Sequence, residues 1–317
     1  MPKLVTVVGA TGLQGQAVIA ALKDDPNYTL RGLTRNTAGK GANKLRSQGV
    51  EVVQAEADDV NSLKAAFASS SVVYAVTGID ELLALGDLEK AATYETRRGI
   101  NIAQAVHETE SVEHFIWSTL PPAKTISDGQ FEPGNYVGKT RVDEYIRTQP
   151  DLMAKTTLLL IAQYAKNLMY APLSVYQLPQ AGSWAQFTTH PPETPIWWIG
   201  DVTKNLTFFI KPILDQADRT RGGAVFAHAD VTTAEESLQL WAKVRGVKAV
   251  SIPVTPEIHH ALWGGYSDVL GTMWRFWGVC KEKSWTYPGL KVLDRDDLGV
   301  PTKDFVSLEK SFESLKL

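Results

Sequence analysis

The chain has 317 residues, of which 44% are hydrophobic and 21% charged, a composition typical of a globular protein with a large core. Its 32 basic and 35 acidic side chains give a formal charge of −3 without a long run of either sign, which argues against a nucleic-acid or anionic-membrane partner. The single cysteine, Cys280, cannot form an intrachain disulfide, and no uncharged apolar stretch is long enough to span a bilayer. These features, with no signal-peptide pattern at the first residues, predict a cytoplasmic protein.

The first half of the chain alternates apolar runs with segments of helical periodicity. Strands are expected at residues 4–8, 28–34, 50–54, 72–76, 112–117 and 156–161. Helices are expected between them at residues 13–23, 42–48, 61–68, 88–107 and 137–148. Strands that alternate with helices predict right-handed crossovers and a parallel sheet covered on both faces. The expected fold class is therefore α/β, a doubly wound parallel Rossmann sheet.

The second half of the chain has a different pattern. Residues 163–195 are rich in Tyr, Gln, Pro and Trp and show no clear period, which favours a substrate lobe beyond the last parallel strand. A capping box over 232–235 predicts a helix at 236–245. A strand is expected at 249–254, and residues 256–280 have a helical pattern. We expect a smaller C-terminal lobe of α+β type.

Three glycines stand where the first strand should turn into the first helix. Gly9 permits a tight turn, Gly12 has no side chain to hold a pyrophosphate away, and Gly15 lets the helix pack closely on the sheet. The free N–H groups at the start of such a helix favour phosphate. The spacing is GxxGxxG and not the more common GxGxxG. Its place between strand and helix still predicts a dinucleotide site, with a purely structural turn as the alternative.

An arginine follows the second expected strand. An NAD-specific site places Asp or Glu there to bind the ribose 2′-hydroxyl, whereas this chain has Arg35. A guanidinium matches a 2′-phosphate in charge and in bidentate geometry. The residue therefore predicts NADP(H) as the cofactor, with a solvated arginine at a strand end as the alternative.

Five segments follow one another along the chain: GATGLQG, RGLTR, GVEVVQAEADDVNSL, VYAVTG and NIAQAVHETESVEHFIWSTL. In this order they resemble the NmrA-like family, atypical members of the short-chain dehydrogenase/reductase superfamily. The resemblance is strong over residues 3–170 and weak afterwards. It implies an NADP-binding Rossmann domain followed by a smaller C-terminal lobe.

The resemblance also implies where the dinucleotide lies. The glycine-rich loop would hold the phosphates, Arg35 the 2′-phosphate, and Lys139 the nicotinamide ribose. An acidic pair after the third strand would lie by the adenine. The segments after the fourth and sixth strands would line the remainder of the dinucleotide. The residues implied are Gly9, Thr11, Gly12, Leu13, Gln14 and Gly15, then Asp58 and Asp59, then Thr77, Gly78 and Ile79, then Lys139, and last Ala162, Gln163 and Tyr164.

The expected catalytic residues are Lys139, Tyr136 and Ser118. Superfamily enzymes use Tyr-x-x-x-Lys, in which the lysine lowers the pKa of the tyrosine and the tyrosine protonates the substrate oxygen. Asn135 stands at that tyrosine position here, so the standard pair is absent. Tyr136, three residues before Lys139, would share its helical face if the helix begins by residue 136. The alternative is that Tyr136 lies in the preceding loop and only packs.

Candidate substrate contacts are Thr119, Tyr164 and Asn167. Ser118 and Thr119 end the fifth strand, where either hydroxyl can orient a carbonyl or satisfy strand-end backbone. Asn167 is equally suited to capping the turn in which it lies. The aromatic second half favours a small, apolar or aromatic substrate. Without a His, Cys or Asp cluster of ligand spacing, no metal is predicted.

These observations divide the chain into two expected domains. An NADP-binding domain spans 1–162, and 163–317 is mostly a substrate lobe, with segments near 195–230 returning to the Rossmann sheet. The leading hypothesis is an NADPH-dependent oxidoreductase that reduces a small aromatic or polyketide-like carbonyl or enone of secondary metabolism. The alternative is a non-catalytic NADP(H)-sensing regulatory protein that acts through a protein partner.

Overall fold

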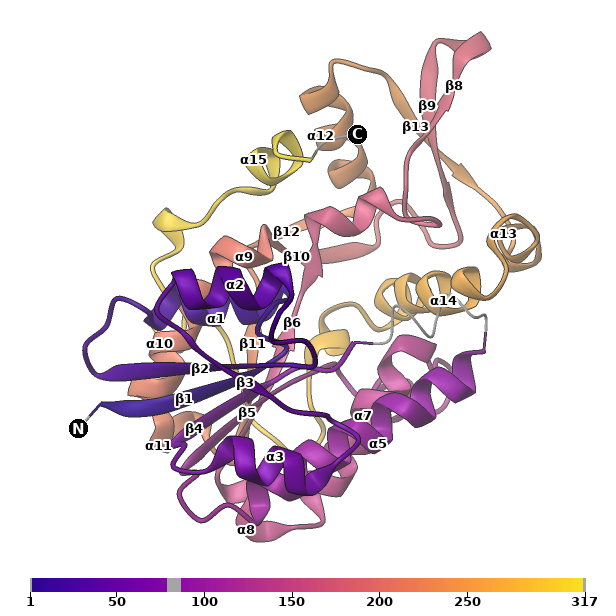
Figure 1. Cartoon of the computed structure of the whole chain (residues 1–317). Helices are drawn as coiled ribbons and strands as arrows, with labels where there is room; N and C mark the ends of the chain where they lie inside the picture. The colour runs from indigo at the N-terminus through magenta and orange to yellow at the C-terminus, as the bar shows by residue number, and fades with distance from the viewer. Residues whose placement is uncertain (1, 79–86, 316–317) are drawn as a thin grey trace.

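A parallel sheet forms the centre of the molecule in the computed structural model, which describes residues 2–78 and 87–315 (Figure 1). Within these residues its strands are β1 (Lys3–Val8), β2 (Tyr28–Thr34), β3 (Glu51–Gln54), β4 (Val72–Ala75), β5 (His114–Thr119), β6 (Thr156–Ile161), β11 (Gly223–Ala227) and β14 (Val292–Leu293). Their order is β14-β11-β6-β5-β4-β1-β2-β3, and neighbouring strands all run parallel. The fold class is the one expected, α/β with a Rossmann-like sheet.

The strand order reverses at β1, which lies between β2 and β4. In open parallel sheets, ligands bind outside the carboxyl ends of the strands at such a switch point. The central strands β4, β5 and β6 are buried at every residue because helices cover both faces of the sheet. The order of these buried strands thus places a candidate ligand site at the carboxyl end of β1.

Helices form a layer on each face of the sheet (Figure 1). One layer holds α1 (Leu13–Leu22), α2 (Lys40–Ser47), α9 (Val202–Asn205) and α10 (Thr207–Asp215), and the other holds α3 (Val60–Phe67), α5 (Leu88–His107), α7 (Gly134–Arg147) and α8 (Pro150–Ala154). Short helices between strands are α6 (Ala123–Ile126) and α11 (Ala217–Thr220). No helix of the described residues is both long and apolar enough to cross a bilayer.

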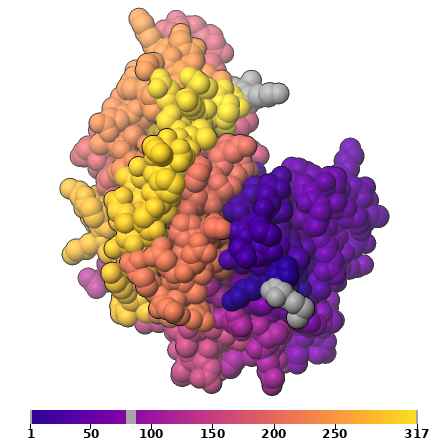
Figure 2. Space-filling model, turned by 90° about the vertical axis from the view of Figure 1, so that its left-hand side faces the viewer, coloured from indigo at the N-terminus to yellow at the C-terminus, as the bar shows by residue number. Residues whose placement is uncertain are grey.

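The later residues build two small sheets beside the large one. One sheet, in the order β12-β10-β7, consists of β7 (Gln163–Tyr164), β10 (Pro195–Gly200) and β12 (Asp230–Thr233), and the other, in the order β13-β9-β8, consists of β8 (Tyr176–Leu178), β9 (Ser183–Thr188) and β13 (Ala249–Pro253). The remaining elements are the helices α12 (Ala234–Arg245), α13 (Pro256–Trp263), α14 (Gly265–Cys280) and α15 (Leu308–Glu313), and the 3₁₀ turns η1 (Ala165–Met169), η2 (Pro179–Ala181), η3 (Lys281–Trp285) and η4 (Thr302–Asp304). Figure 2 shows the late segments, orange to yellow, packed along one side of the indigo N-terminal segment.

Within 195–230, β11 pairs in the large sheet, whereas β10 pairs with β7 and β12. Two expectations about the second half need correction. The capping box lies one residue later than expected, because Thr233 and Glu236 exchange the two capping hydrogen bonds. The helical pattern over 256–280 is broken at Gly264, whose φ of 58° ends α13 and starts α14 in a new direction.

The helix that carries Lys139 begins earlier than its periodicity predicts. It starts at Gly134, directly after Pro133, whose φ of −59° suits a helix start. Gly134 and Asn135 are weak helix formers, so the sequence pattern misses this first turn. As a consequence Tyr136 lies on the helix and not in the preceding loop.

Candidate active site

A groove at the carboxyl ends of β1, β2, β3 and β4 encloses ≈ 440 Å³. It occupies the switch point of the sheet, where the glycine-rich loop turns into α1. Predicted residues that line it are Gly9, Thr11, Arg35, Asp58, Thr77 and Gly78. Ile79, also predicted here, lies outside the described residues.

The glycines of the loop have separable roles. Gly9 has a φ of 80°, which a side chain would strain. A Cβ on Gly15 would lie 2.3 Å from the Gly9 carbonyl oxygen and 2.6 Å from the Ala10 Cα, so the close approach of α1 to the loop requires glycine. A Cβ on Gly12 would meet only the Gly9 oxygen, at 3.3 Å. Gly12 is the N-cap of α1 and offers no side-chain cap, which leaves first-turn N–H groups available to an anion.

The two acidic residues after β3, Asp58 and Asp59, have different roles. Asp58 lines the groove and accepts hydrogen bonds from the guanidinium groups of Arg97, at 2.6 Å, and Arg98, at 2.9 and 3.1 Å. These arginines, Arg98 first, lower the pKa of Asp58 below its usual value. Asp59 instead caps α3, where its carboxylate accepts from the backbone N–H groups of Asn61 and Ser62. Of this pair, only Asp58 therefore lines the groove.

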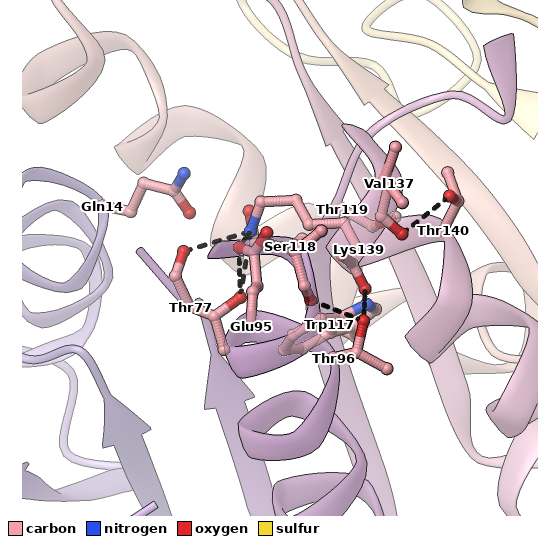
Figure 3. Close-up of polar contacts among 12 residues, drawn as sticks. Gln14, Thr77, Glu95, Thr96, Trp117, Ser118, Thr119, Val137, Lys139 and Thr140 are labelled. Atoms are coloured by element: carbon pink, nitrogen blue, oxygen red, sulfur yellow. Dashed lines mark hydrogen bonds and ion pairs between the residues drawn. The ribbon is translucent and has the colours of Figure 1, made fainter. Parts of the chain in front are cut away.

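A buried ion pair connects the groove to the centre of the sheet (Figure 3). The Lys139 Nζ lies 3.2 Å from the Glu95 Oε1, and the Glu95 side chain has no exposed surface. The same ammonium donates to the Thr77 carbonyl oxygen at 3.1 Å and to the Ser118 carbonyl oxygen at 3.5 Å. The Thr77 hydroxyl donates to the Glu95 Oε1 at 2.7 Å. Lys139 thereby joins the ends of β4 and β5 to α5.

Glu95 was not predicted from the sequence, although a signal for it exists. It lies on the buried face of α5 with Ala91, Ala92, Gly99 and Ile102, where the spacing calls for an apolar residue. The opposing helix makes room for it, because a Cβ on Gly138 would lie 2.5 Å from the Glu95 Oε2. A charged residue within an apolar stripe is thus the pattern that marks this site.

The Tyr136 hydroxyl has no hydrogen-bond partner among the described residues. The side chain is 2% exposed and packs edge-on against Phe276, with ring centroids 6.3 Å apart. Burial raises the pKa of this phenol well above its usual value, and the Trp277 indole offsets only part of the shift. This direction is opposite to the lowering that a Tyr–Lys pair produces, and the role of Tyr136 stays a prediction.

A second cavity of ≈ 160 Å³ lies at the ends of β5 and β6. It brings together the predicted residues Gln14, Ser118, Thr119, Tyr136, Lys139, Ala162, Gln163, Tyr164 and Asn167. The C-terminal lobe adds mostly apolar side chains to the wall, namely Leu270, Met273, Trp277 and Trp285. An apolar wall with a few polar groups is typical of a site for a small organic molecule.

Hydrogen bonds tie the wall of this cavity to the glycine-rich loop. The Gln14 amide donates to the Tyr164 hydroxyl at 2.6 Å and accepts from the Tyr74 hydroxyl at 2.5 Å. The Asn167 amide donates to the Gln163 side-chain oxygen at 3.3 Å. Gln14 therefore belongs both to the loop at the start of α1 and to the wall of the second cavity.

A buried carboxyl behind this wall was also missed by the sequence analysis. Asp143 lies one helical turn after Lys139 and has no exposed surface. It accepts hydrogen bonds from the Trp117 indole at 2.8 Å, the Thr119 hydroxyl at 2.7 Å and the Tyr287 hydroxyl at 3.1 Å. Burial raises the pKa of Asp143 to about 7, although the three donors and Lys139 act in the opposite direction.

In the described ranges, no cluster of three or more His, Cys, Asp or Glu side chains is placed to hold a metal ion.

Comparison with known proteins identifies relatives across almost the whole chain. The model of the NmrA-like family matches residues 1–298. The NmrA-like family domain-containing oxidoreductase hkm9 of Aspergillus hancockii is 27% identical over 262 residues, which cover 78% of this chain and 74% of the relative. The oxidoreductase notA of Aspergillus sp. (strain MF297-2) is 29% identical over 275 residues, or 80% of this chain and 76% of the relative.

Solved structures share the fold at lower identity. NmrA, a negative transcriptional regulator crystallised with NADP, gives a TM-score of 0.76 at 18% identity and covers 99% of this chain and 95% of its own. The triphenylmethane reductase of Citrobacter sp., crystallised with NADP(H), gives a TM-score of 0.67 at 17% identity and covers 98% of each chain. At these identities the comparison establishes the architecture alone.

The two loop glycines allow a matched test. Gly15→Ala should lower the free energy of unfolding by about 1–3 kcal/mol, because its Cβ meets backbone atoms that cannot move aside. Gly12→Ala should cost less stability than Gly15→Ala, because its Cβ meets only the Gly9 oxygen at 3.3 Å, yet it should obstruct a pyrophosphate at the start of α1. Urea denaturation and calorimetric titration with dinucleotide separate the two effects. Unimpaired dinucleotide binding in Gly12→Ala would contradict a phosphate site at this loop.

The ion pair between Lys139 and Glu95 also has a paired test. Lys139→Met should destabilise the protein by about 3–5 kcal/mol, because Glu95 is left as a buried charge without a counter-ion. The double variant Lys139→Met, Glu95→Gln should regain most of this loss, since no charge remains. Chemical denaturation at neutral pH measures both. Equal instability of the single and double variants would assign the loss to packing.

Proposed function

Because the chain belongs to the NmrA-like family, we propose that it is an NADPH-dependent oxidoreductase that reduces a small aromatic or polyketide-like carbonyl or enone. Relatives named as oxidoreductases and NADP-bound structures of the same fold support this assignment. The domain division that goes with it has an NADP-binding domain at residues 1–162 and mostly a substrate-binding lobe at 163–317.

The observation that carries the proposal is the junction between the two cavities. Thr77 lines the larger groove and Lys139 lines the smaller cavity, and the two are joined by a hydrogen bond of 3.1 Å. A dinucleotide with its adenosine half in the groove would therefore place its other end at Lys139. There the apolar wall of the smaller cavity would hold a substrate against it.

The residues present suit NADP(H). The first turn of α1 offers N–H groups to the pyrophosphate, and Arg35 on the groove wall offers a guanidinium to the 2′-phosphate. Lys139 and Thr77 offer polar groups to the nicotinamide ribose. Bound NADPH would supply the hydride. The protein would hold the substrate in the apolar cavity, exclude water and deliver one proton to the substrate oxygen.

The proton would come from a hydroxyl of the cavity wall. Tyr136 and Ser118 are the candidates that the sequence suggests, and both line the cavity. Burial raises the pKa of Tyr136, so its phenol is protonated at neutral pH, as a proton donor requires. Tyr136→Phe removes only the hydroxyl. A fall in turnover of about 10²–10⁴-fold with unchanged nucleotide affinity would assign the acid to Tyr136.

The activity is tested by following NADPH oxidation with a panel of aromatic ketones, quinones and enones. The double variant Lys139→Met, Glu95→Gln serves as the control, because it removes the ammonium without leaving a buried charge. We expect turnover by the wild type and loss of nearly all turnover in the control. Tight NADPH binding without turnover of any compound, together with capture of a specific protein, would instead support the sensor.

The preference for NADP(H) depends on Arg35. Arg35→Ala should weaken NADP binding by about 1.5–3 kcal/mol, the value of a charge-assisted hydrogen bond, and should leave NAD binding almost unchanged. Lys44→Ala, an exposed α2 substitution outside the groove lining, is the matched control. Calorimetry with both nucleotides measures the effect. An equal loss for NAD and NADP would show that Arg35 does not contact the 2′-phosphate.

A further inference from the structure

Thr119 and Asp143 form a hydrogen-bonded pair directly behind the smaller cavity. Thr119 lines the cavity, and its hydroxyl donates to the Asp143 Oδ2 at 2.7 Å. Asp143 itself is fully buried on α7 and has no place in the cavity lining. A titratable group thus lies one hydrogen bond away from the space in which a substrate would bind.

A threonine hydroxyl carries only one proton. When Asp143 is ionised, that proton is directed at the carboxylate, and Thr119 cannot donate to a ligand. When Asp143 is protonated, its own O–H can donate to the Thr119 oxygen and release the threonine proton for the cavity. The protonation state of Asp143 therefore decides whether Thr119 acts as a donor.

We propose that Asp143 supplies the proton of the reduction through Thr119. This inference rests on the proposed reductase function. As hydride adds to the carbonyl carbon, the C=O π bond breaks and the substrate oxygen takes the proton of the Thr119 hydroxyl. Thr119 takes the proton of Asp143, which is left as a carboxylate and regains a proton through the Thr119 hydroxyl when water refills the emptied cavity. The balance is one carbonyl, one NADPH and one proton to one alcohol and one NADP⁺.

The surroundings of Asp143 suit this role. Burial raises the pKa of Asp143 to about 7, so both protonation states are populated near neutral pH, where an acid catalyst works best. The charged groups around it are Lys139 on its own helix, whose ammonium is paired with Glu95 of α5, and Arg147, which lies over the Tyr287 ring at 5.6 Å. Tyr287 is the other titratable contact, and its hydroxyl donates to Asp143.

The kinetic test uses phenanthrenequinone, a flat dicarbonyl, as the probe with NADPH. Wild-type kcat should fall by about tenfold per pH unit above pH about 7, as the acid loses its proton. Thr119→Val and Asp143→Asn should lose about 10²-fold or more in kcat, and neither should keep the pH dependence. Thr119→Ser retains a hydroxyl and should restore both rate and profile. An unchanged profile in Asp143→Asn would overturn the proposal and leave the reductase intact.

A binding test separates this proposal from the proposed function. Phenanthrenequinone binding to the NADP⁺-loaded protein is followed by tryptophan fluorescence, because Trp277 and Trp285 line the cavity. Affinity should rise as the pH falls through about 7 in the wild type and Thr119→Ser, and it should stay constant in Thr119→Val. A pH-independent wild-type affinity would overturn the coupling of Thr119 to Asp143. Normal pH-dependent binding without any NADPH oxidation would instead overturn the reductase function and the proton transfer that rests on it.

Discussion

The buried pair of Lys139 and Glu95 is the interaction on which the site depends. One ammonium contacts carbonyl oxygens that follow β4 and end β5, and a carboxylate on α5. Two parallel strands and two helices therefore meet at a single charge. Taking both ions out of water is costly, and their attraction together with the added hydrogen bonds must offset that cost. The same contacts hold Thr77 at the groove and Lys139 at the smaller cavity. The ion pair therefore fixes the point at which the two cavities meet.

The sequence predicts those parts of the fold in which the local pattern of apolar residues matches the burial that the folded protein gives them. The strands of the N-terminal half and the glycine-rich turn are found where their periods place them, because buried parallel strands must be continuously apolar. The roles of Glu95 and Asp143 cannot be predicted in this way. Each lies on an apolar helix face, and only a partner far away in the sequence explains why it is there. Asp143 contacts Tyr287, 144 residues further along the chain. No local pattern carries that pairing.

The aromatic residues of the second half show a similar division. The sequence suggests that they form a substrate lobe, and Trp277 and Trp285 do line the smaller cavity. Trp198, Trp241 and Trp274 are buried to the same degree but do not line this cavity. Of these rings only Trp198 lies in a small sheet, on β10, whereas Trp241, Trp274 and Trp277 lie on the helices α12 and α14. Composition identifies an aromatic lobe but not which rings a ligand can reach.

Gln14 gives the molecule one further property. Its backbone lies in the first turn of α1, where a dinucleotide phosphate would bind, and its side chain holds Tyr164 in the wall of the neighbouring cavity. Where binding at one site moves a residue shared with a second site, the two affinities are coupled, and such coupling is reciprocal. If the nucleotide changes the affinity of the second ligand by some factor, the second ligand must change the affinity of the nucleotide by the same factor.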